Sequence, residues 1–216
     1  MKLIIGNKNY SSWSLRPWLL LSAFDIPFEE VRVPLYIAST RAELAKYTDA
    51  GKVPVLHDKD IVVWDSLAIC EYVSEQYLNG RGWPSDTAAR AEARACCAEM
   101  HSGFFALRES MPMNCRASGR RVAMTPDLEK DIARIDGLWT ELRKKYSAAG
   151  PWLFGAFSIA DCMFAPVAFR FNTYRTEMPE ACGRYVKQIL QHPKVTQWLV
   201  DAVKEPETIA SSEVGV

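Results

Sequence analysis

The sequence predicts an α/β domain followed by an all-helical domain, and three observations lead to this division. Strand and helix patterns alternate over residues 1–78, whereas no strand pattern occurs after residue 86. The stretch between them, NGRGWPSD at residues 79–86, combines glycines, a proline and polar residues, which is typical of a linker. Residues 87–204 then form the helical domain, and the small, polar residues 205–216 are predicted to be a frayed tail.

The first domain reads as strand, helix, strand, helix, two strands and helix. Helices between strands predict parallel pairing, and the last two strands, joined by the polar turn 58–60, predict an antiparallel hairpin. The result is a mixed four-strand sheet covered by helices. Ser14 is expected to cap the first helix, which keeps Pro17 in its first turn, and Ser66 the last. The expected strands are 2–6, 28–35, 53–57 and 61–64, and the expected helices are 14–24, 40–47 and 67–78.

The second domain shows only helical periodicity. Residues 127–147 carry leucine, isoleucine and tryptophan on one face, as an amphipathic helix does. Ser158 and Asp161 have the spacing of a capping box, which predicts the start of a buried helix and a role in folding. The expected helices are 87–111, 127–147, 159–174, 181–191 and 194–203, with an irregular connection at 112–126.

Composition and charge exclude several classes of protein. Hydrophobic residues make up 49% of the chain, and 26 Lys and Arg balance 26 Asp and Glu, so the net positive charge of a nucleic-acid binder is missing. No segment is long and apolar enough for a signal peptide or a membrane span, so we expect a cytoplasmic protein without membrane contact. The six cysteines form no C-x-x-C pair and have no metal-ligand spacing, which predicts reduced thiols and no metal.

Three short clusters in the first domain carry candidate chemistry. In Val53-Pro54, a cis peptide bond would turn the Val53 backbone outward, where an extended peptide could pair with it; the alternative is an ordinary trans turn proline. Asp65-Ser66 precedes a helix, whose free N–H groups and dipole favour an anion, although a cap alone is the simpler interpretation.

The third cluster, Tyr10 to Arg16, leads into the first helix and contains the serines. A hydroxyl beside a helix start could donate to a thiolate and lower the pKa of the thiol, although loop polarity and a cap also explain it. A Ser-His-Asp site is not favoured, because the chain has three histidines and no G-x-S-x-G.

Together, in this order, the clusters resemble the glutathione transferase family, over roughly residues 1–204. The resemblance implies a thioredoxin-like first domain that binds glutathione as co-substrate, and a helical domain that shapes the second-substrate site. Ser-Ser-Trp-Ser-Leu-Arg is similar to the serine motif of zeta-class and related bacterial members, which implies Ser11, with Ser12 as the fallback, as the residue that stabilises the thiolate. Trp13 stands where zeta members have cysteine.

The resemblance also implies how glutathione would be bound. Lys52-Val53-Pro54 matches the family's cis-proline motif, in which Val53 pairs with the cysteinyl backbone. Asp65-Ser66 matches its Glu-Ser or Gln-Ser pair, which binds the γ-glutamyl end. Thr40, Arg41 or Lys52 would meet the glycyl carboxylate. The implied glutathione-binding residues are therefore Trp13, Thr40, Lys52, Val53, Pro54, Asp65 and Ser66. Tyr10 lies too close to Arg16 for the tyrosine-type pattern and is a minor catalytic candidate.

The second-substrate site is expected between the domains. Met100, Phe104, Leu107 and Met111 share one face of the helix predicted at 87–111, although such a stripe is more often core than pocket. An acidic substrate could be held by an arginine. The candidate residues are His101, Phe104, Arg108, Met111 and Arg175, with Met113 and Phe169 nearby.

Three functions follow from the resemblance. The first is conjugation of the glutathione thiolate to small electrophiles. The second is a zeta-like cis-trans isomerase that acts on a maleyl-type substrate, and the third is a non-catalytic interaction protein with the same fold. The family also implies a homodimer.

Overall fold

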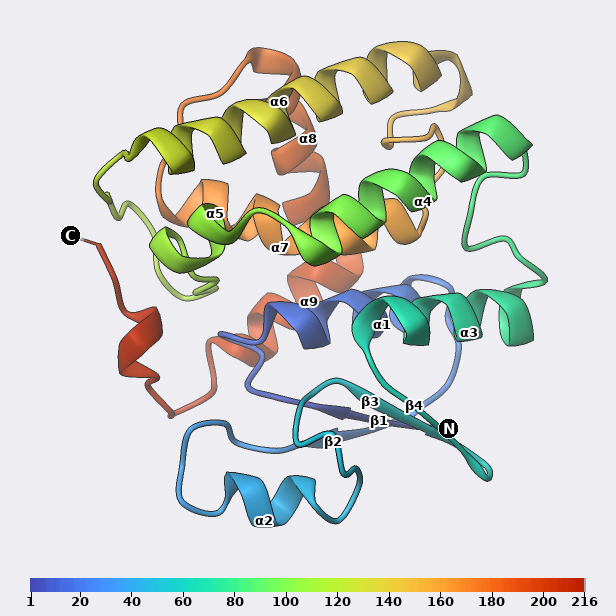
Figure 1. Cartoon of the computed structure of the whole chain (residues 1–216), viewed down its shortest axis with the longest axis vertical. Helices are drawn as coiled ribbons and strands as arrows, with labels where there is room; N and C mark the ends of the chain where they lie inside the picture. The colour runs from blue at the N-terminus through green and yellow to red at the C-terminus, as the bar shows by residue number, and fades with distance from the viewer. Residues whose placement is uncertain (216) are drawn as a thin grey trace.

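The computed structural model describes residues 1–215 and contains the predicted mixed sheet (Figure 1). Its strands are β1 (Lys2–Ile5), β2 (Glu29–Arg32), β3 (Val55–Asp58) and β4 (Ile61–Val63), in the order β2-β1-β3-β4. β1 pairs parallel with β2 and antiparallel with β3, and β3 pairs antiparallel with β4. The apolar run of β1 explains its central place, because a central strand is buried on both faces.

Helices cover both faces of this sheet. α1 (Ser12–Ala23) and α3 (Ser66–Leu78) lie between the sheet and the helical domain, and α2 (Thr40–Leu44) lies on the opposite side (Figure 1). Side chains alternate accordingly: Leu3 and Ile5 join the main core, whereas Ile4 packs with Leu44 of α2 in a smaller cluster. The first domain therefore has the thioredoxin-like arrangement.

The second domain consists of α4 (Thr87–Ser102), α5 (Phe105–Ser110), α6 (Pro126–Tyr146), α7 (Ile159–Thr173), α8 (Glu180–Leu190) and α9 (Pro193–Ala202). α7 is its centre: every residue but Asn172 is buried, and the helix packs against α1, α4 and α8. The Asp161 carboxylate accepts from the Ser158 backbone N–H at 2.9 Å, so the predicted capping box is confirmed. The main core thus continues from the helical domain to α1, and the two domains share it.

Two predicted helix starts are wrong by a few residues. Ser11, not Ser14, is the N-cap of α1, so Pro17 lies inside the helix rather than in its first turn. Asp65, not Ser66, caps α3, because its carboxylate accepts from the backbone N–H groups of Leu67 and Ala68. In both cases a neighbouring polar residue competed for the same capping role.

The single helix predicted at 87–111 is also wrong, because α4 ends at Ser102 and α5 begins only at Phe105. Gly103 is extended and Phe104 is left-handed, with φ at 59°, before α5 begins. The side-chain spacing across the break mimics a continuous helix. The hairpin turn is shorter than expected, since only Lys59 and Asp60 separate β3 from β4.

The tail predicted to fray is instead packed against the body over its described part. Glu205 is buried, and residues Ala210–Ser212 form a 3-10 helix. The Glu205 carboxylate accepts from the backbone N–H groups of Lys8 at 2.7 Å and Asn9 at 3.1 Å. Sequence polarity alone did not reveal these partners, which lie almost the whole chain away.

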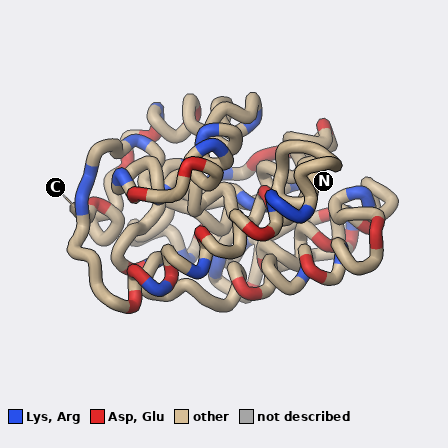
Figure 2. Tube along the Cα trace, turned by 90° about the horizontal axis from the view of Figure 1, so that it is seen from above, with Lys and Arg blue, Asp and Glu red and all other residues tan. Residues whose placement is uncertain are grey.

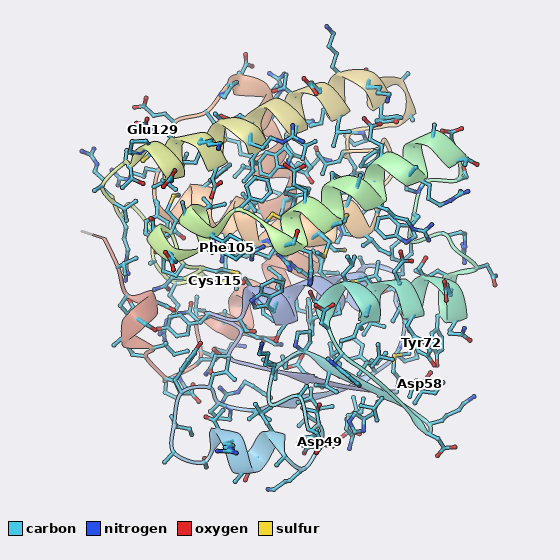
Figure 3. All side chains as sticks on the ribbon, viewed as in Figure 1. Asp49, Asp58, Tyr72, Phe105, Cys115 and Glu129 are labelled. Carbon is cyan, nitrogen blue, oxygen red and sulfur yellow. The ribbon has the colours of Figure 1, made fainter. Side chains whose placement is uncertain are left out.

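The hairpin is tied to α3 through one carboxylate. Asp58 lies beside Tyr72 (Figure 3), whose hydroxyl donates to it at 2.9 Å, and Tyr77 donates to the same oxygen. The Tyr77 hydrogen bond is the main reason that the pKa of Asp58 is lowered.

Positive and negative side chains are interspersed along the chain (Figure 2). Within residues 1–215, no helix combines the length and the apolar character needed to cross a membrane.

Candidate functional site

The serine cluster forms a chain of hydroxyls at the start of α1. The backbone N–H of Gly6 donates to Ser14 Oγ at 3.1 Å, and the Ser11 and Ser14 hydroxyl oxygens are 2.8 Å apart. Ser11 is 6% exposed and closes the N-terminus of the helix. Gly6 makes the close approach feasible, since a Cβ there would lie 3.2 Å from Ser11 Cβ and 2.5 Å from Leu35 Cδ1.

Ser12, the fallback candidate, faces the helical domain. Its hydroxyl oxygen accepts from Arg170 Nη2 of α7 at 3.4 Å, and the side chain is as buried as that of Ser11. Tyr10 points elsewhere: its hydroxyl donates to Glu213 at 2.6 Å and accepts from Arg116 at 2.8 Å. The loop thus sends its three hydroxyl groups in three directions.

The Val53–Pro54 peptide bond is cis, at the point where the chain enters β3. Within residues 1–215 the Val53 backbone N–H and C=O form no hydrogen bond, so both groups remain available to a ligand. Lys52 is exposed beside them. Thr40 is occupied by its own turn, because its hydroxyl donates to Pro34 O at 2.8 Å and accepts from Ile37 N–H at 3.0 Å.

Asp65 joins the two domains at the start of α3. One carboxylate oxygen accepts from the backbone N–H groups of Leu67 and Ala68, and the other lies 2.7 Å from Nε2 of His101 in α4. The Trp64–Asp65 bond is also cis. Ser66 is fully buried, and its hydroxyl oxygen accepts from Arg16 Nη1 at 3.4 Å.

Trp13 lies at the centre of a group of cations. The guanidinium carbons of Arg16 and Arg108 are 4.2 and 4.7 Å from the centre of its ring, and the His101 ring meets it edge-on at 5.3 Å. Burial is the main cause that lowers the pKa of His101, and Arg16 and Arg108 lower it further while Asp65 opposes them. The structure therefore brings Trp13, Asp65, His101 and Arg108 together from both domains.

Arg16 and Arg170 were not among the predicted site residues. Both are buried in apolar helices, Arg16 in α1 and Arg170 in α7. The available signal was a single charge within each apolar run, SLRPWLLL and APVAFRF, because a lone charge in a buried helix needs a partner or a role.

The other second-substrate candidates lie elsewhere. Phe104 and Met111 belong to the main hydrophobic core, as do Met113 and Phe169. Arg175 is exposed after the end of α7, and its guanidinium lies against Gly119.

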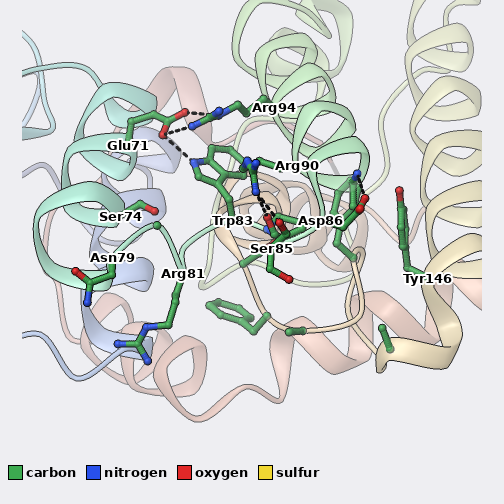
Figure 4. Close-up of a pocket in the computed structure, with 18 of the residues that line it drawn as sticks. Glu71, Ser74, Asn79, Arg81, Trp83, Ser85, Asp86, Arg90, Arg94 and Tyr146 are labelled. Carbon is green, nitrogen blue, oxygen red and sulfur yellow. Dashed lines mark hydrogen bonds and ion pairs between the residues drawn. The ribbon is translucent and has the colours of Figure 1, made fainter.

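A cavity of about 820 Å³ occupies a different place, between the linker, the end of α3 and the ends of α4 and α6 (Figure 4). Glu71 accepts there from the Trp83 indole at 2.8 Å and from Arg94 at 3.0 Å. None of the predicted catalytic, glutathione-binding or second-substrate residues lines this cavity.

Comparison with known proteins gives the same family for both halves of the chain. Residues 10–76 match the family model of the glutathione S-transferase N-terminal domain, and residues 123–200 match that of the C-terminal domain. The glutathione S-transferase GstB of Escherichia coli is 25% identical over 205 residues, which cover 89% of this chain and 95% of that protein. The probable maleylacetoacetate isomerase of Caenorhabditis elegans is 32% identical over 94 residues, 44% of each chain.

Among solved structures, a glutathione transferase homolog from Burkholderia with bound glutathione superposes with a TM-score of 0.71. It is 22% identical and the match covers 94% of this chain and 98% of that one. At this identity the likeness establishes the fold.

Proposed function

Because the chain belongs to the glutathione S-transferase family, we propose that it conjugates glutathione to small electrophiles. The observation that carries the proposal is the hydroxyl chain from Gly6 through Ser14 to Ser11 at the start of α1. A helix N-terminus with a hydroxyl donor favours a thiolate over a thiol.

The backbone of Val53 would hold glutathione in an extended form. Its free N–H and C=O match the cysteinyl amide groups, as in the addition of a strand to a sheet. The γ-glutamyl end would lie at the start of α3, where the backbone N–H of Ser66 has no partner within residues 1–215. Lys52 beside Val53 supplies a cation for the glycyl carboxylate.

Ser11 would stabilise the sulfur by reversing one hydrogen bond. A hydroxyl hydrogen can rotate, and Ser14 can donate to Ser11 Oγ while it still accepts from Gly6. The Ser11 hydrogen is then free to point at the thiolate. The thiol proton passes to solvent, the sulfur–carbon bond forms, and the leaving group departs with its electron pair.

Replacement of each serine by alanine tests these roles. Ser11→Ala should lower kcat for conjugation of an aryl halide by about 10²-fold to 10³-fold, with little change in glutathione affinity, because the hydroxyl acts on the thiolate. Ser12→Ala is the matched control, since it removes the adjacent hydroxyl of equal burial. Unchanged turnover in Ser11→Ala with a collapse in Ser12→Ala would move the role to Ser12.

An isomerase acting through the same thiolate is the second candidate. The partial similarity to a probable maleylacetoacetate isomerase and the arginines around Trp13 favour an acidic substrate of that kind. Parallel assays of a maleyl-type acid and an aryl halide separate the two activities.

The non-catalytic alternative predicts no binding to immobilised glutathione. The homodimer that the family implies is also a proposal, which light scattering tests.

A further inference from the structure

Three arginines from three helices meet around the serines and Trp13. Arg16 of α1 and Arg108 of α5 both contact the Trp13 ring, and Arg170 of α7 reaches Ser12. Burial is the main cause that lowers the pKa of each arginine, and the charge of Arg108 lowers that of the other two. The three positive charges are therefore close enough to repel one another.

These arginines form no ion pair in the part of the chain that the structure describes, and only the more distant Asp131 carboxylate raises the pKa of one of them, Arg108. No carboxylate of residues 1–215 lies within 4.0 Å of their guanidinium nitrogens, whereas exposed arginines such as Arg94 and Arg134 have a glutamate partner. Their hydrogen bonds to hydroxyl groups are long, at 3.4 Å.

Several guanidinium nitrogens are both buried and without a partner. They are Nε and Nη2 of Arg16, Nε of Arg170 and Nη1 of Arg108. Arg16 is fully buried and Arg170 is 4% exposed, so water does not replace the missing partners over most of their surface. Arg108 is held by carbonyl oxygens of Met100 and Gly103 through its other nitrogens, which leaves Nη1 oriented and unused.

Buried cations are ordinarily paired, because desolvation of an unpaired charge is costly. The face of Trp13 compensates part of that cost for Arg16 and Arg108 by cation–π attraction. A bound oxyanion would compensate far more, since planar guanidinium donors suit carboxylates.

We propose that Arg16, Arg108 and Arg170 form an anion subsite that selects electrophiles bearing a carboxylate. The inference deepens the proposed transferase function and rests on it. Arg108 and Arg170 belong to the helical domain, whereas the Val53 backbone that would pair with glutathione belongs to the first domain. We therefore assign the anion to the second substrate. The substrate's carboxylate takes the place of the Trp13 face at Arg108, while the carbon that reacts is directed toward Ser11.

Two electrophiles of the same shape, one charged and one neutral, test the subsite: 4-chloro-3-nitrobenzoate and 4-chloro-3-nitrobenzamide. Each rate is divided by that of the uncatalysed reaction with glutathione, because the amide ring is intrinsically the more reactive. The intact protein should convert the acid with a kcat/KM at least about tenfold above that of the amide, as expected for charge-assisted hydrogen bonds. Arg108→Gln should remove this preference by lowering kcat/KM for the acid far more than kcat/KM for the amide. Arg184→Gln, at an exposed pair with Glu180, is the control and should change neither rate.

The results also show whether the anion belongs to the second substrate or to glutathione. Equal rates for acid and amide in the intact protein overturn the subsite, and so does a rise in the KM for glutathione in Arg108→Gln without loss of the acid preference. Arg170→Gln gives a second test if Arg108→Gln does not fold, as judged by its melting curve.

A protein that converts neither compound refutes the proposed function instead. In that case calorimetric titration with 3-nitrobenzoate and 3-nitrobenzamide still decides the subsite. Selective binding of the acid, lost in the arginine variants, supports it, and equal binding of the two compounds overturns it.

Discussion

Single residues in this protein often act through partners far along the chain. Asp161 is fully buried, and its carboxylate accepts from the Leu153 backbone, the Ser158 backbone and hydroxyl, and the Tyr185 hydroxyl. The spacing to Ser158 was predictable, because a capping box is local. The bonds to Leu153 and Tyr185 required the folded chain, since each comes from a separate element.

Asp161 makes the stability of the fold depend on pH. Burial raises its pKa from the ordinary 3.8 to about 6. Between these values the folded state holds the proton and the unfolded state has lost it, so the free energy of unfolding falls as pH rises. The fall should amount to roughly 3 kcal/mol at most.

Urea unfolding of the protein and of Asp161→Asn, at a series of pH values from about 4 to about 7, measures this contribution. The variant should be about 2–4 kcal/mol less stable near pH 4, because its amide cannot satisfy the same donors. It should also lack the Asp161 part of the pH dependence. If the free energy of unfolding depends on pH in the same way in both proteins, the pKa of Asp161 is not raised in the folded state.

At the scale of elements, the order and type of helices and strands followed from the sequence, because hydrophobic periodicity is a local property. The mixed sheet, the helical second half and the capping box were all predicted. The break at Gly103 was not, since the apolar spacing from Met100 to Met111 imitates one continuous helix. The caps were misplaced where two polar neighbours compete, as Ser11 and Ser14 do.

The candidate site was predictable only in part for the same reason. The Val53–Pro54 cis bond and the clusters at Ser11 and Asp65 lie in short motifs that a sequence displays. The meeting of Arg16, Arg108 and Arg170 depends on how α1, α5 and α7 pack, and no local pattern records it.

Two glycines should respond in opposite ways to the same substitution. Gly150 has φ at 137°, and a Cβ there would strike the Gly155 backbone, so Gly150→Ala should cost about 1–3 kcal/mol. Gly137 lies in the exposed middle of α6 with open space around it, so Gly137→Ala should stabilise by about 0.5–1 kcal/mol. Thermal melting of both variants checks the signs. Destabilisation of both would show that the Gly137 face is covered.

At the scale of the whole molecule, the C-terminal segment supports the loop that leads to Ser11. Glu205 accepts from the backbone of Lys8 and Asn9, and Trp198 donates to Lys8 O at 2.9 Å. The loop after β1 and the segment that includes Trp198 and Glu205 therefore meet beside the candidate site. Because a buried N–H without a partner is costly, this contact should matter for both stability and turnover.

Glu205→Ala should lower the free energy of unfolding by about 2–3 kcal/mol, because two N–H groups lose their acceptor. Turnover should fall severalfold as the loop loosens. Glu180→Ala removes an equally charged side chain that is 88% exposed and should change stability by less than about 0.5 kcal/mol. Equal effects of the two substitutions in denaturant unfolding would exclude a supporting role for Glu205.

The assignment of Ser11 to the thiolate can be measured by titrating protein-bound glutathione, with the ultraviolet absorbance of the thiolate followed against pH. The bound thiol should have a pKa well below its value of ~8.5 in solution, and Ser11→Ala should raise this pKa most of the way back while glutathione remains bound. A bound thiol that titrates as it does in free solution, or a lowered value that Ser11→Ala leaves unchanged, would contradict the assignment of Ser11 to the sulfur.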